Sequence, residues 1–269
     1  MKADGRKIIS MSLYGNSSRY IWGVIRNAQL IPLYFAEWTL RVYIAADPSP
    51  SDLAVPPKII KKLERLGVQI AKVSTKNTTS PRNWRLLVAK DKHVDYFLVR
   101  DADTRLSERE AAAIREWLSV AEQYGFVVHC IRDHPNHVDQ AIVDGLWGGR
   151  PGLLHQLLRQ DVTQIMDSVL SNIAPSVNRP PYVIGNFLNE ILWPVVRDSA
   201  LCHDSVSPCD RWTTSTFRRP YPSMRYGEEY VGQKFNAHHE PLNEDSNQLD
   251  VDVVCTWDSF HSVVSKLIK

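Results

Sequence analysis

Cysteine is scarce in this chain, and the few that occur have no metal-binding or redox spacing. They are Cys130, Cys202, Cys209 and Cys255. Thiols scattered in this way are typical of a reducing compartment, so we expect a cytoplasmic protein. Long apolar runs are missing too, because the stretch before Gly15 is too short for a secretory signal or a membrane span, and no later stretch is longer. The sequence therefore predicts no transmembrane segment, while a peripheral contact with a membrane stays open.

An excess of charge of one sign is also absent. The 32 Lys and Arg residues nearly balance the 30 Asp and Glu residues, which leaves a net charge of +2. So small a charge argues against nucleic acid as a partner, and any anion must be recognised locally. The 269 residues are enough for one large domain with a substantial core, and we expect a single domain over residues 1–269.

Strand-like and helix-like segments alternate through the first half of the chain. Strands are expected at residues 8–14, 40–45, 68–73, 96–99 and 126–131. Helices are expected at 18–31, at 57–66, from Pro81 onward with Ser80 as its cap, and at 108–120, where Ser107 and Glu110 have the spacing of a capping box. This alternation predicts an α/β fold with a mostly parallel sheet flanked by helices.

Two carboxylates follow the apolar strand at residues 96–99. Asp101 and Asp103 lie just past its end, where parallel sheets bind ligands, and Arg100 and Arg105 bracket them. In an extended chain, carboxylates two residues apart point to one side and can hold a hard divalent cation on a diphosphate. The arginines would neutralise the remaining phosphate oxygens. The alternative is a capped strand end with surface ion pairs that stabilise little.

The second half of the chain is less regular. The polar run of residues 132–137 follows a strand, and the glycines between 145 and 152 would let the backbone approach a ligand closely. Helices are expected at 153–171, at 186–196 with an interruption at Pro194, and at 257–268, and a strand end at 201–205 would present His203. Residues 206–250 read as an irregular extension, ordered only when docked on the core or on a ligand.

Several motifs in this order resemble a small group of nucleotide-sugar-dependent glycosyltransferases of GT-A fold. The motifs are Met11-Ser-Leu-Tyr-Gly-Asn16, Asn83-Trp-Arg-Leu-Leu-Val88, Arg100-Asp-Ala-Asp-Thr-Arg-Leu-Ser-Glu-Arg-Glu110, Glu116-Trp-Leu118, Ile131-Arg-Asp-His-Pro-Asn-His137, Gly145-Leu-Trp-Gly148, Trp193-Pro194 and His203-Asp-Ser205. The resemblance covers about residues 8–205. It implies a nucleotide-sugar-binding half at 1–131, an acceptor and catalytic half at 132–205, and the irregular extension with a terminal helix at 206–269.

The resemblance also implies roles for individual residues. Asp101 and Asp103 would form the DxD motif that holds Mn²⁺ or Mg²⁺ on the donor, with His203 as the third protein ligand. The nucleoside diphosphate sugar, expected to be a UDP-sugar, would be bound by Ser12, Tyr14, Gly15, Asn16, Arg82, Arg85, Arg100, Asp101, Ala102 and Asp103. Arg82 and Arg85 have a second interpretation as a solvent-exposed helix face, and His203 as a structural histidine.

Catalytic roles follow from the same resemblance. Asp133 is the expected base, and His134 is expected to lie over the donor sugar and the acceptor, which would be a hydroxyl of a glycan, a lipid or a protein. Retaining relatives carry an Asp-Gln pair where this chain has Tyr182-Val-Ile-Gly-Asn-Phe-Leu-Asn-Glu190, so that Asn186 or Asn189 would take its place. A retaining or an inverting course both stay open.

The expected activity is therefore metal-dependent, hexosyltransferase-like glycosyl transfer. Two alternatives stand beside it. The run at residues 97–104 also looks like the DxDxT motif of a haloacid-dehalogenase-type phosphohydrolase, with Asp101 as nucleophile. The other is a nucleotide-sugar-binding protein without turnover, which the missing Asp-Gln pair favours.

Overall fold

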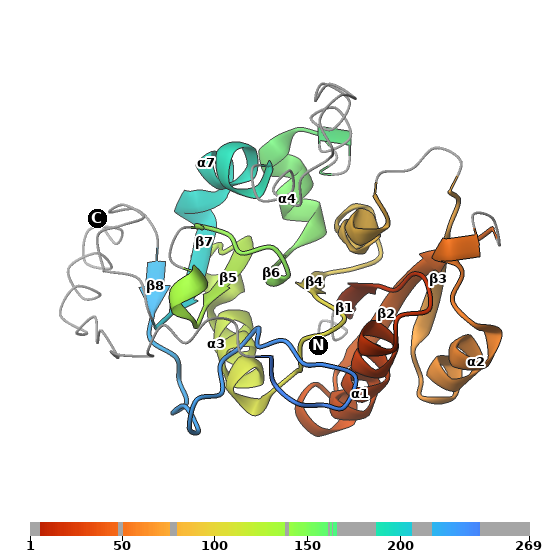
Figure 1. The fold of residues 1–269 in the computed structure, drawn as a ribbon. Coiled ribbons are helices and arrows are strands. Elements are labelled where there is room, and N and C mark those ends of the chain that lie inside the picture. Colours follow the sequence, from red (N-terminus) through yellow and green to blue (C-terminus); the bar gives the residue numbers. More distant parts are fainter. Residues whose placement is uncertain are drawn as a thin grey trace, which may run out of the picture.

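One mixed sheet forms the centre of the protein. The computed structural model describes residues 6–47, 51–75, 80–137, 140–160, 162, 164–165, 187–205 and 217–242. Within these ranges eight strands make a single sheet in the order β3-β2-β1-β4-β6-β5-β7-β8, and β6 alone runs antiparallel to its neighbours (Figure 1). The strands are β1 (Lys7–Ser12), β2 (Trp38–Ala45), β3 (Gln69–Val73), β4 (Tyr96–Arg100), β5 (Val128–Arg132), β6 (Leu146–Gly149), β7 (Ala200–Asp204) and β8 (Phe217–Arg219).

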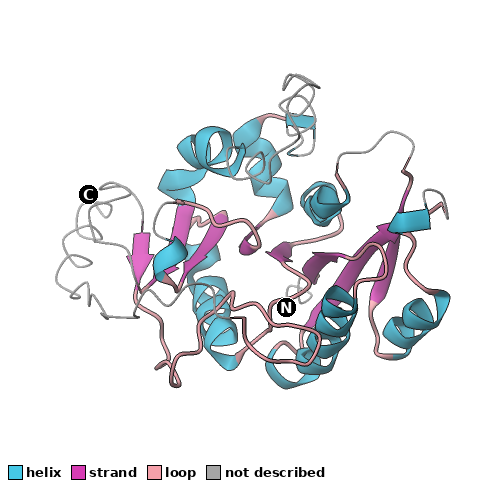
Figure 2. Cartoon of the chain, in the orientation of Figure 1, coloured by secondary structure: helices cyan, strands magenta, loops and turns pink. Residues whose placement is uncertain are grey.

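Helices cover both faces of the sheet (Figure 2). The α-helices are α1 (Ser18–Tyr34), α2 (Pro57–Arg65), α3 (Glu108–Tyr124), α4 (Pro151–Leu158) and α7 (Trp193–Val196). Short 3₁₀ helices span Ser51–Leu53, Pro81–Lys90, Pro135–His137 and Arg197–Ser199, and a π-helical turn spans Phe187–Leu192. One face packs on α1, α2 and α3, and the opposite face packs on Pro81–Lys90, α4 and α7.

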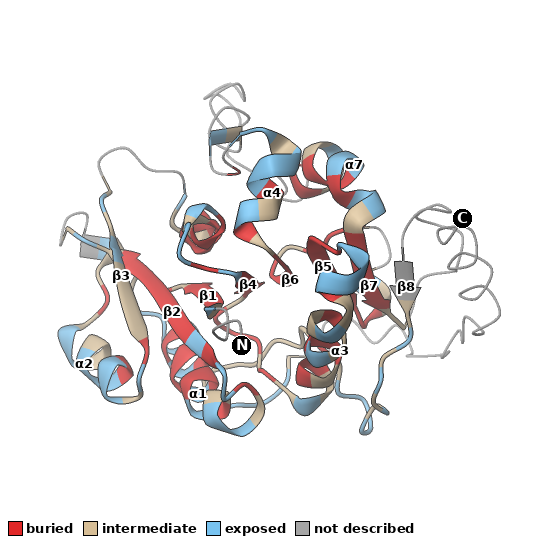
Figure 3. Ribbon diagram, turned by 180° about the vertical axis from the view of Figure 1, so that it is seen from behind, coloured by how far each residue is buried: buried red, intermediate tan, exposed pale blue. Residues whose placement is uncertain are grey.

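Alternation along the strands divides the apolar core into two layers. Ile9 and Leu98 point to the layer under α1 and α3, whereas their neighbours Ile8 and Phe97 point to the layer under the 3₁₀ helix Pro81–Lys90. Every residue of β4 and β5 is buried, as Figure 3 shows for the middle of the sheet. Strands covered on both faces read as unbroken apolar runs, which is why β4 is legible in the sequence.

The order of the strands reverses between β1 and β4. The chain leaves β1 through α1 toward β2 on one side, and it leaves β4 through α3 toward β5 on the other side. The segments that follow β1 and β4 therefore separate at the carboxyl edge of the sheet, and such a reversal point is where α/β sheets bind ligands. Residues 13–17 follow β1 and residues 101–107 follow β4 at this edge, and the 101–107 turn contacts Arg19, Gly23 and Asn27 of α1.

The predicted fold class is confirmed, with differences in detail. The helix predicted at 18–31 continues through Pro32 to Tyr34, and the one predicted from Pro81 is a 3₁₀ helix whose N-terminus Ser80 does not cap through its side chain. The Ser107 hydroxyl does cap α3 by accepting a hydrogen bond from the Glu110 amide (3.3 Å). Strand β6 was not predicted, because glycines make half of its four residues.

The C-terminal part of the described chain docks on the core. β8 extends the sheet beside β7, and the segment after it forms an isolated bridge between Lys234 and Thr104. Of the extension predicted at 206–250, the described residues 217–242 are thus partly regular and contact the core, and the remainder lies outside the described residues. The helix predicted at 257–268 and the whole region from 166 to 186 lie outside the described residues. Among the described helices, none combines the length and the apolar character needed to cross a membrane.

Candidate functional site

A tight turn at residues 101–103 follows β4 at the carboxyl edge of the sheet. The Thr104 hydroxyl donates to the carbonyl of Asp101 (3.0 Å), and the Asn27 amide of α1 donates to the carbonyl of Thr104 (2.9 Å). The backbone amide of Leu106 returns a hydrogen bond to the Asn27 side-chain oxygen (3.0 Å). Asn27 is fully buried, so these bonds fix the turn on helix α1.

Two glycines make room for this turn. A Cβ on Gly23 of α1 would overlap the carbonyl oxygen of Ala102, so helix and turn pack backbone against backbone. Gly145 has a φ of +85°, and a Cβ there would lie 2.5 Å from Oδ2 of Asp101. The sequence suggested that Gly145 serves a ligand, whereas in the structure it admits the Asp101 carboxylate.

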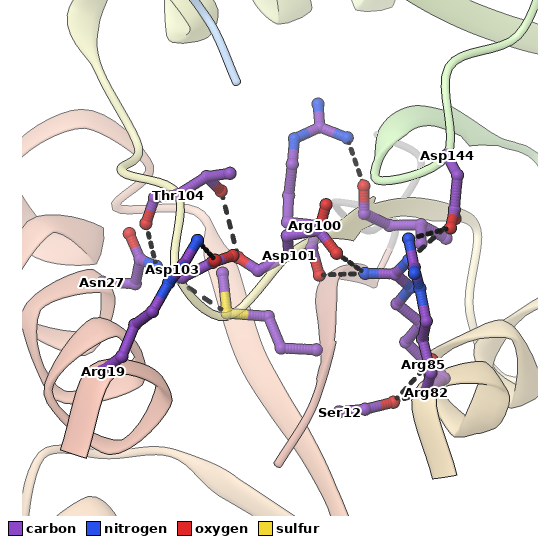
Figure 4. A network of polar contacts seen from close by, with 12 residues as sticks. Ser12, Arg19, Asn27, Arg82, Arg85, Arg100, Asp101, Asp103, Thr104 and Asp144 are labelled. Carbon is purple, nitrogen blue, oxygen red and sulfur yellow. Dashed lines mark hydrogen bonds and ion pairs between the residues drawn. The ribbon is translucent and has the colours of Figure 1, made fainter. Parts of the chain in front are cut away.

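Asp101 belongs to a chain of ion pairs on one side of the turn (Figure 4). Its Oδ1 accepts a hydrogen bond from Arg85, which also pairs with Asp144 (2.7 Å). Arg82 pairs with the second oxygen of Asp144 (2.9 Å). The Ser12 hydroxyl holds this helix by accepting from the Arg85 amide (2.9 Å) and donating to the Arg82 carbonyl (3.2 Å). Ser12 thus positions both arginines.

Asp103 pairs on the opposite side of the same turn. Its Oδ2 lies 2.5 Å from Arg19, in the first turn of α1, and Figure 4 shows Arg19 and Arg85 flanking the two carboxylates from opposite sides. The prediction of an extended chain with both carboxylates on one side does not hold, because residues 101–103 turn. Each carboxylate instead has its own guanidinium.

The electrostatics distinguish the two carboxylates. Burial raises the pKa of Asp101, but Arg85, Arg82 and Lys234 outweigh this effect and hold the pKa below its ordinary value. Burial also raises the pKa of Asp103, the charge of Asp101 raises it further, and Arg19 only partly offsets the rise. Asp101 therefore stays ionised at neutral pH, while Asp103 takes up a proton more readily than a free aspartate.

Lys234 approaches the turn from the C-terminal segment. It forms the bridge with Thr104, and the next amide, of Phe235, donates to the carbonyl of Asp103 (3.0 Å). Its ammonium contributes to the lowered pKa of Asp101. Since the segment 231–242 is anchored on the turn, this positive charge is held near the carboxylates.

The loop after β1 forms the neighbouring wall. Tyr14 is 37% exposed and packs edge-on against Trp84 at 6.4 Å, and Asn16 is exposed. Gly15 has a φ of +70°, and its amide donates to the carbonyl of Leu53 (3.0 Å). Tyr14 and Asn16 therefore have exposed side chains on the loop after β1, whereas the Ser12 hydroxyl is engaged with the backbone of residues 82 and 85.

Arg100 does not reach this site. Its guanidinium is 1% exposed, pairs with Glu110 at 2.5 Å and donates to the carbonyl of Trp147 (2.9 Å). The expected contact with a diphosphate is therefore corrected to a buried ion pair that ties α3 to the sheet. Arg105 donates to the backbone carbonyls of Asp103 (3.2 Å) and Thr104 (2.9 Å), and its guanidinium lies over the Phe235 ring at 4.8 Å.

Asp133 is enclosed by hydrogen-bond donors instead of facing an acceptor. Its side chain is fully buried, and both of its oxygens are used by donors from Arg109, Ser205, Arg225 and the amide of Val231. Burial raises the pKa of Asp133, but these donors bring it below the ordinary value. A carboxylate stabilised in this way cannot act as the predicted base. Its neighbour His134 is 4% exposed and packs against the Tyr230 ring at 4.2 Å.

His203 is not a partner of the two aspartates. It is fully buried in β7, where its Nδ1 lies 2.7 Å from Nε2 of His129 and its Nε2 lies 3.1 Å from Glu116. Within the described part of the chain no group of three His, Cys, Asp or Glu side chains is arranged to hold a metal ion. The predicted ligand set Asp101, Asp103 and His203 is therefore corrected, and His203 is a core histidine.

The structure adds three residues that sequence reasoning missed. Arg19 and Asp144 contact the predicted site residues directly, and Lys234 lies on the same turn. Arg19 follows the serines after β1, a position in which its approach to the β4 turn could have been anticipated. No sequence pattern around Asp144 or Lys234 indicated that either residue would lie near the β4 turn. The predicted catalytic residue Asn186 lies outside the described residues, and Asn189 exchanges hydrogen bonds with the backbone of Ile142 (3.0 and 3.1 Å).

The sequence matches no known family model and no curated protein. Solved structures to which the chain is similar include the glycosyltransferase GlyE of Streptococcus pneumoniae TIGR4, at 10% identity over 77% of this chain and 46% of that one, with a TM-score of 0.46. A glycosyltransferase involved in the glycosylation of the major capsid of PBCV-1 is 15% identical over 74% of this chain and 81% of that one, with a TM-score of 0.44.

The mannosyltransferase PcManGT of Pyrobaculum calidifontis, solved with GDP-Man and Mn²⁺, is 16% identical over 58% of this chain and 47% of that one, with a TM-score of 0.41. The chain spans only about half the length of PcManGT and of Staphylococcus aureus TarS 1–349 (48%). A 4-diphosphocytidyl-2C-methyl-D-erythritol synthase is similar at a TM-score of 0.40.

Proposed function

We propose that this protein transfers a sugar from a nucleoside diphosphate sugar to a hydroxyl acceptor. The observation that supports it best is the meeting of Asp101 and Asp103 with Arg82 and Arg85 at the edge of the sheet between the ends of β1 and β4. A diphosphate needs positive charge on its oxygens, and a divalent cation on it needs carboxylates. This edge of the sheet carries both.

The carboxylates suit a hard cation. Mn²⁺ and Mg²⁺ prefer oxygen ligands, and Mg²⁺ commonly uses one or two carboxylates while substrate phosphates and water complete its coordination. Asp101 and Asp103 would hold such a cation without a third protein ligand. When bound, it supplies Lewis-acid stabilisation of the departing diphosphate. We therefore propose Mn²⁺ or Mg²⁺ as the cofactor.

The protein's own cations would share this work. Arg82 is 42% exposed and can donate from a free edge of its guanidinium to a phosphate while Asp144 orients it. Arg85 is 3% exposed and is fixed between Asp101 and Asp144, so that it keeps the Asp101 carboxylate in place. Lys234 adds positive charge beside the turn. Fixed donors of this kind stabilise negative charge that develops on a leaving group.

The loop after β1 would receive the nucleoside. Tyr14 and Asn16 are exposed on this loop and would offer an aromatic surface and an amide to the base or ribose. A UDP-sugar is the proposed donor, and the acceptor is proposed to be a hydroxyl of a glycan, a lipid or a protein. Asp133 is left out of the mechanism because its carboxylate is fully occupied.

Turnover tests the proposal. Each of a panel of UDP- and GDP-sugars is incubated with the protein, Mn²⁺ and a panel of simple sugars and alcohols as hydroxyl acceptors, with water as the acceptor in parallel, and release of the free nucleoside diphosphate is measured by chromatography. We expect release from one class of donor and a loss of roughly a hundredfold in Asp103→Asn, because an electrostatic contribution to the leaving group disappears. The matched control is Asp198→Asn, since Asp198 is 71% exposed. Binding of a nucleotide without release from any donor would identify a binding protein instead.

A further inference from the structure

Arg19 and Arg85 hold their aspartates in different ways. Arg85 is 3% exposed, bridges Asp101 and Asp144, and also donates to the carbonyl of Arg100 (3.3 Å). Arg19 is 34% exposed, and Asp103 is its one acidic partner in the part of the chain that the structure describes. Arg85 is therefore a fixed element of the site, whereas Arg19 can leave its partner by rotating toward solvent.

The position of Arg19 conflicts with a cation on Asp103. Its guanidinium lies 2.5 Å from Oδ2, and the Asp103 side chain is only 6% exposed. A divalent cation would sit about 2 Å from a carboxylate oxygen. It would then face the positive guanidinium at a distance of a few ångströms, where like charges repel strongly in a poorly solvated site. Cation and Arg19 therefore compete for Asp103.

A displaced Arg19 has a place to go. It lies in the first turn of the 17-residue helix α1, directly after the loop that lines the proposed nucleoside position. A diphosphate bridged to the cation would bring phosphate oxygens within reach of a side chain that had been bonded to Asp103. Guanidinium groups bind phosphate and carboxylate with the same two-pronged geometry, so one can replace the other.

We propose that Arg19 is a diphosphate-binding residue that exchanges Asp103 for the donor when the cation binds. The inference rests on the proposed function, since it assumes a cation and a nucleoside diphosphate at this turn. Without donor, Arg19 neutralises Asp103 and weakens the binding of the cation. With donor, the cation takes Asp103 and Arg19 contacts the phosphates, so that cation and donor bind tightly only together.

The test measures two affinities in the full chain. Free Mn²⁺ is titrated by electron paramagnetic resonance without nucleotide, and UDP and GDP are titrated by calorimetry at saturating Mn²⁺, for the wild type and Arg19→Gln. We expect Arg19→Gln to bind Mn²⁺ alone several-fold more tightly, because its competitor is gone. We expect it to bind the nucleotide roughly tenfold more weakly, because a charge-assisted contact is lost. For Arg19→Lys we expect Mn²⁺ and nucleotide affinities between those of the wild type and those of Arg19→Gln.

The predicted changes in Mn²⁺ affinity and nucleotide affinity have opposite signs. This distinguishes the exchange from a structural role of Arg19, whose loss would weaken both affinities. Arg26→Gln, an exposed arginine seven residues along the same helix, serves as control and should change neither. An unchanged or weaker Mn²⁺ affinity in Arg19→Gln, or an unchanged nucleotide affinity, would overturn the exchange while leaving the proposed function intact. If neither protein binds Mn²⁺ or nucleotide, both proposals fail together.

Discussion

Arg109 and Asp133 form a two-pronged ion pair between helix α3 and the end of β5, with Nε to Oδ2 and Nη2 to Oδ1 distances of 2.9 Å each. The same carboxylate accepts from Ser205 (2.6 Å), Arg225 (2.8 Å) and the amide of Val231 (2.9 Å). These donors come from three separate stretches of the chain. Asp133 therefore fastens the C-terminal segment, which includes Lys234, to the core.

Replacing Asp133 should destabilise the protein strongly. Asp133→Asn leaves two guanidinium groups without their counter-charge in a buried place, and breaking such a pair costs roughly 3–5 kcal/mol. Urea unfolding followed by circular dichroism measures this. Asp198→Asn on the surface should stay within about 0.5 kcal/mol of the wild type. A loss below 1 kcal/mol in Asp133→Asn would mean that this carboxylate does not fasten the segment.

Acid should weaken the fold through His203. Glu116 can only accept, so Nε2 of His203 carries the proton, its Nδ1 accepts from Nε2 of His129, and both rings are neutral. Burial, with the charge of Arg109, lowers the pKa of His203 from 6.5 to about 3. Below about pH 6.5 the unfolded chain binds a proton that the folded chain does not. The free energy of unfolding should therefore fall as the pH drops from 6.5 toward 3.

Urea unfolding at pH 7 and pH 5 checks this dependence. Each buried neutral histidine contributes up to about 1.4 kcal/mol per pH unit below 6.5. His203→Gln should reduce the slope, whereas His155→Gln, at an exposed position of α4, should keep it. Equal slopes for wild type and His203→Gln would show that His203 is protonated in the folded protein.

The buried pair of Arg100 and Glu110 should act as a structural unit. Their side chains are 1% and 2% exposed, so that removing one charge leaves the other uncompensated. Arg100→Met alone should cost roughly 3–5 kcal/mol, and the double replacement Arg100→Met with Glu110→Leu should cost much less. A double-mutant cycle from urea unfolding gives the coupling. If the losses in the free energy of unfolding of the two single variants add up to that of the double variant, Arg100 and Glu110 do not act as a structural unit.

A side chain at Gly23 of helix α1 should destabilise the protein. Because a Cβ would overlap the carbonyl of Ala102, Gly23→Ala should push the turn away and cost about 1–3 kcal/mol. The matched control is Gly152→Ala in α4, where a Cβ meets nothing within 4 Å and helix propensity favours alanine by about 0.5–1 kcal/mol. Equal melting temperatures for the two variants would contradict the close packing of helix and turn.

Local patterns were sufficient to predict the framework of the site. The fully buried strand β4 reads as an apolar run, the Ser107 cap marks the start of α3, and both place Asp101 and Asp103 at the edge of the sheet. The choice of partners was less predictable. Arg100 and Asp101 are consecutive at the end of a strand, so their side chains point to opposite faces, and only Asp101 turns to the site. The alternation rule alone argued against Arg100 as a ligand.

Contacts between distant segments of the chain determine the roles of the remaining site residues. His203 was assigned to the metal from the resemblance, but its position in β7 puts it beside His129 of β5 and under α3. Asp133 cannot be the predicted base because its carboxylate accepts hydrogen bonds from Arg225 and Val231, which are distant in the sequence. The spacing of residues along the sequence cannot predict such contacts, because they join segments about a hundred residues apart. The single-domain organisation and the cytoplasmic location stay predictions.

The central claim is that the Asp101–Asp103 turn binds the diphosphate of a nucleotide with a divalent cation. Calorimetric titration of UDP and GDP with Mn²⁺, with a chelator, and with the Asp103→Asn variant tests it most directly. We predict that one nucleotide binds with Mn²⁺, and that binding is lost in chelator and weakened at least tenfold in Asp103→Asn. Absence of nucleotide binding in all conditions, or equal affinity in wild type and Asp103→Asn, would contradict the account.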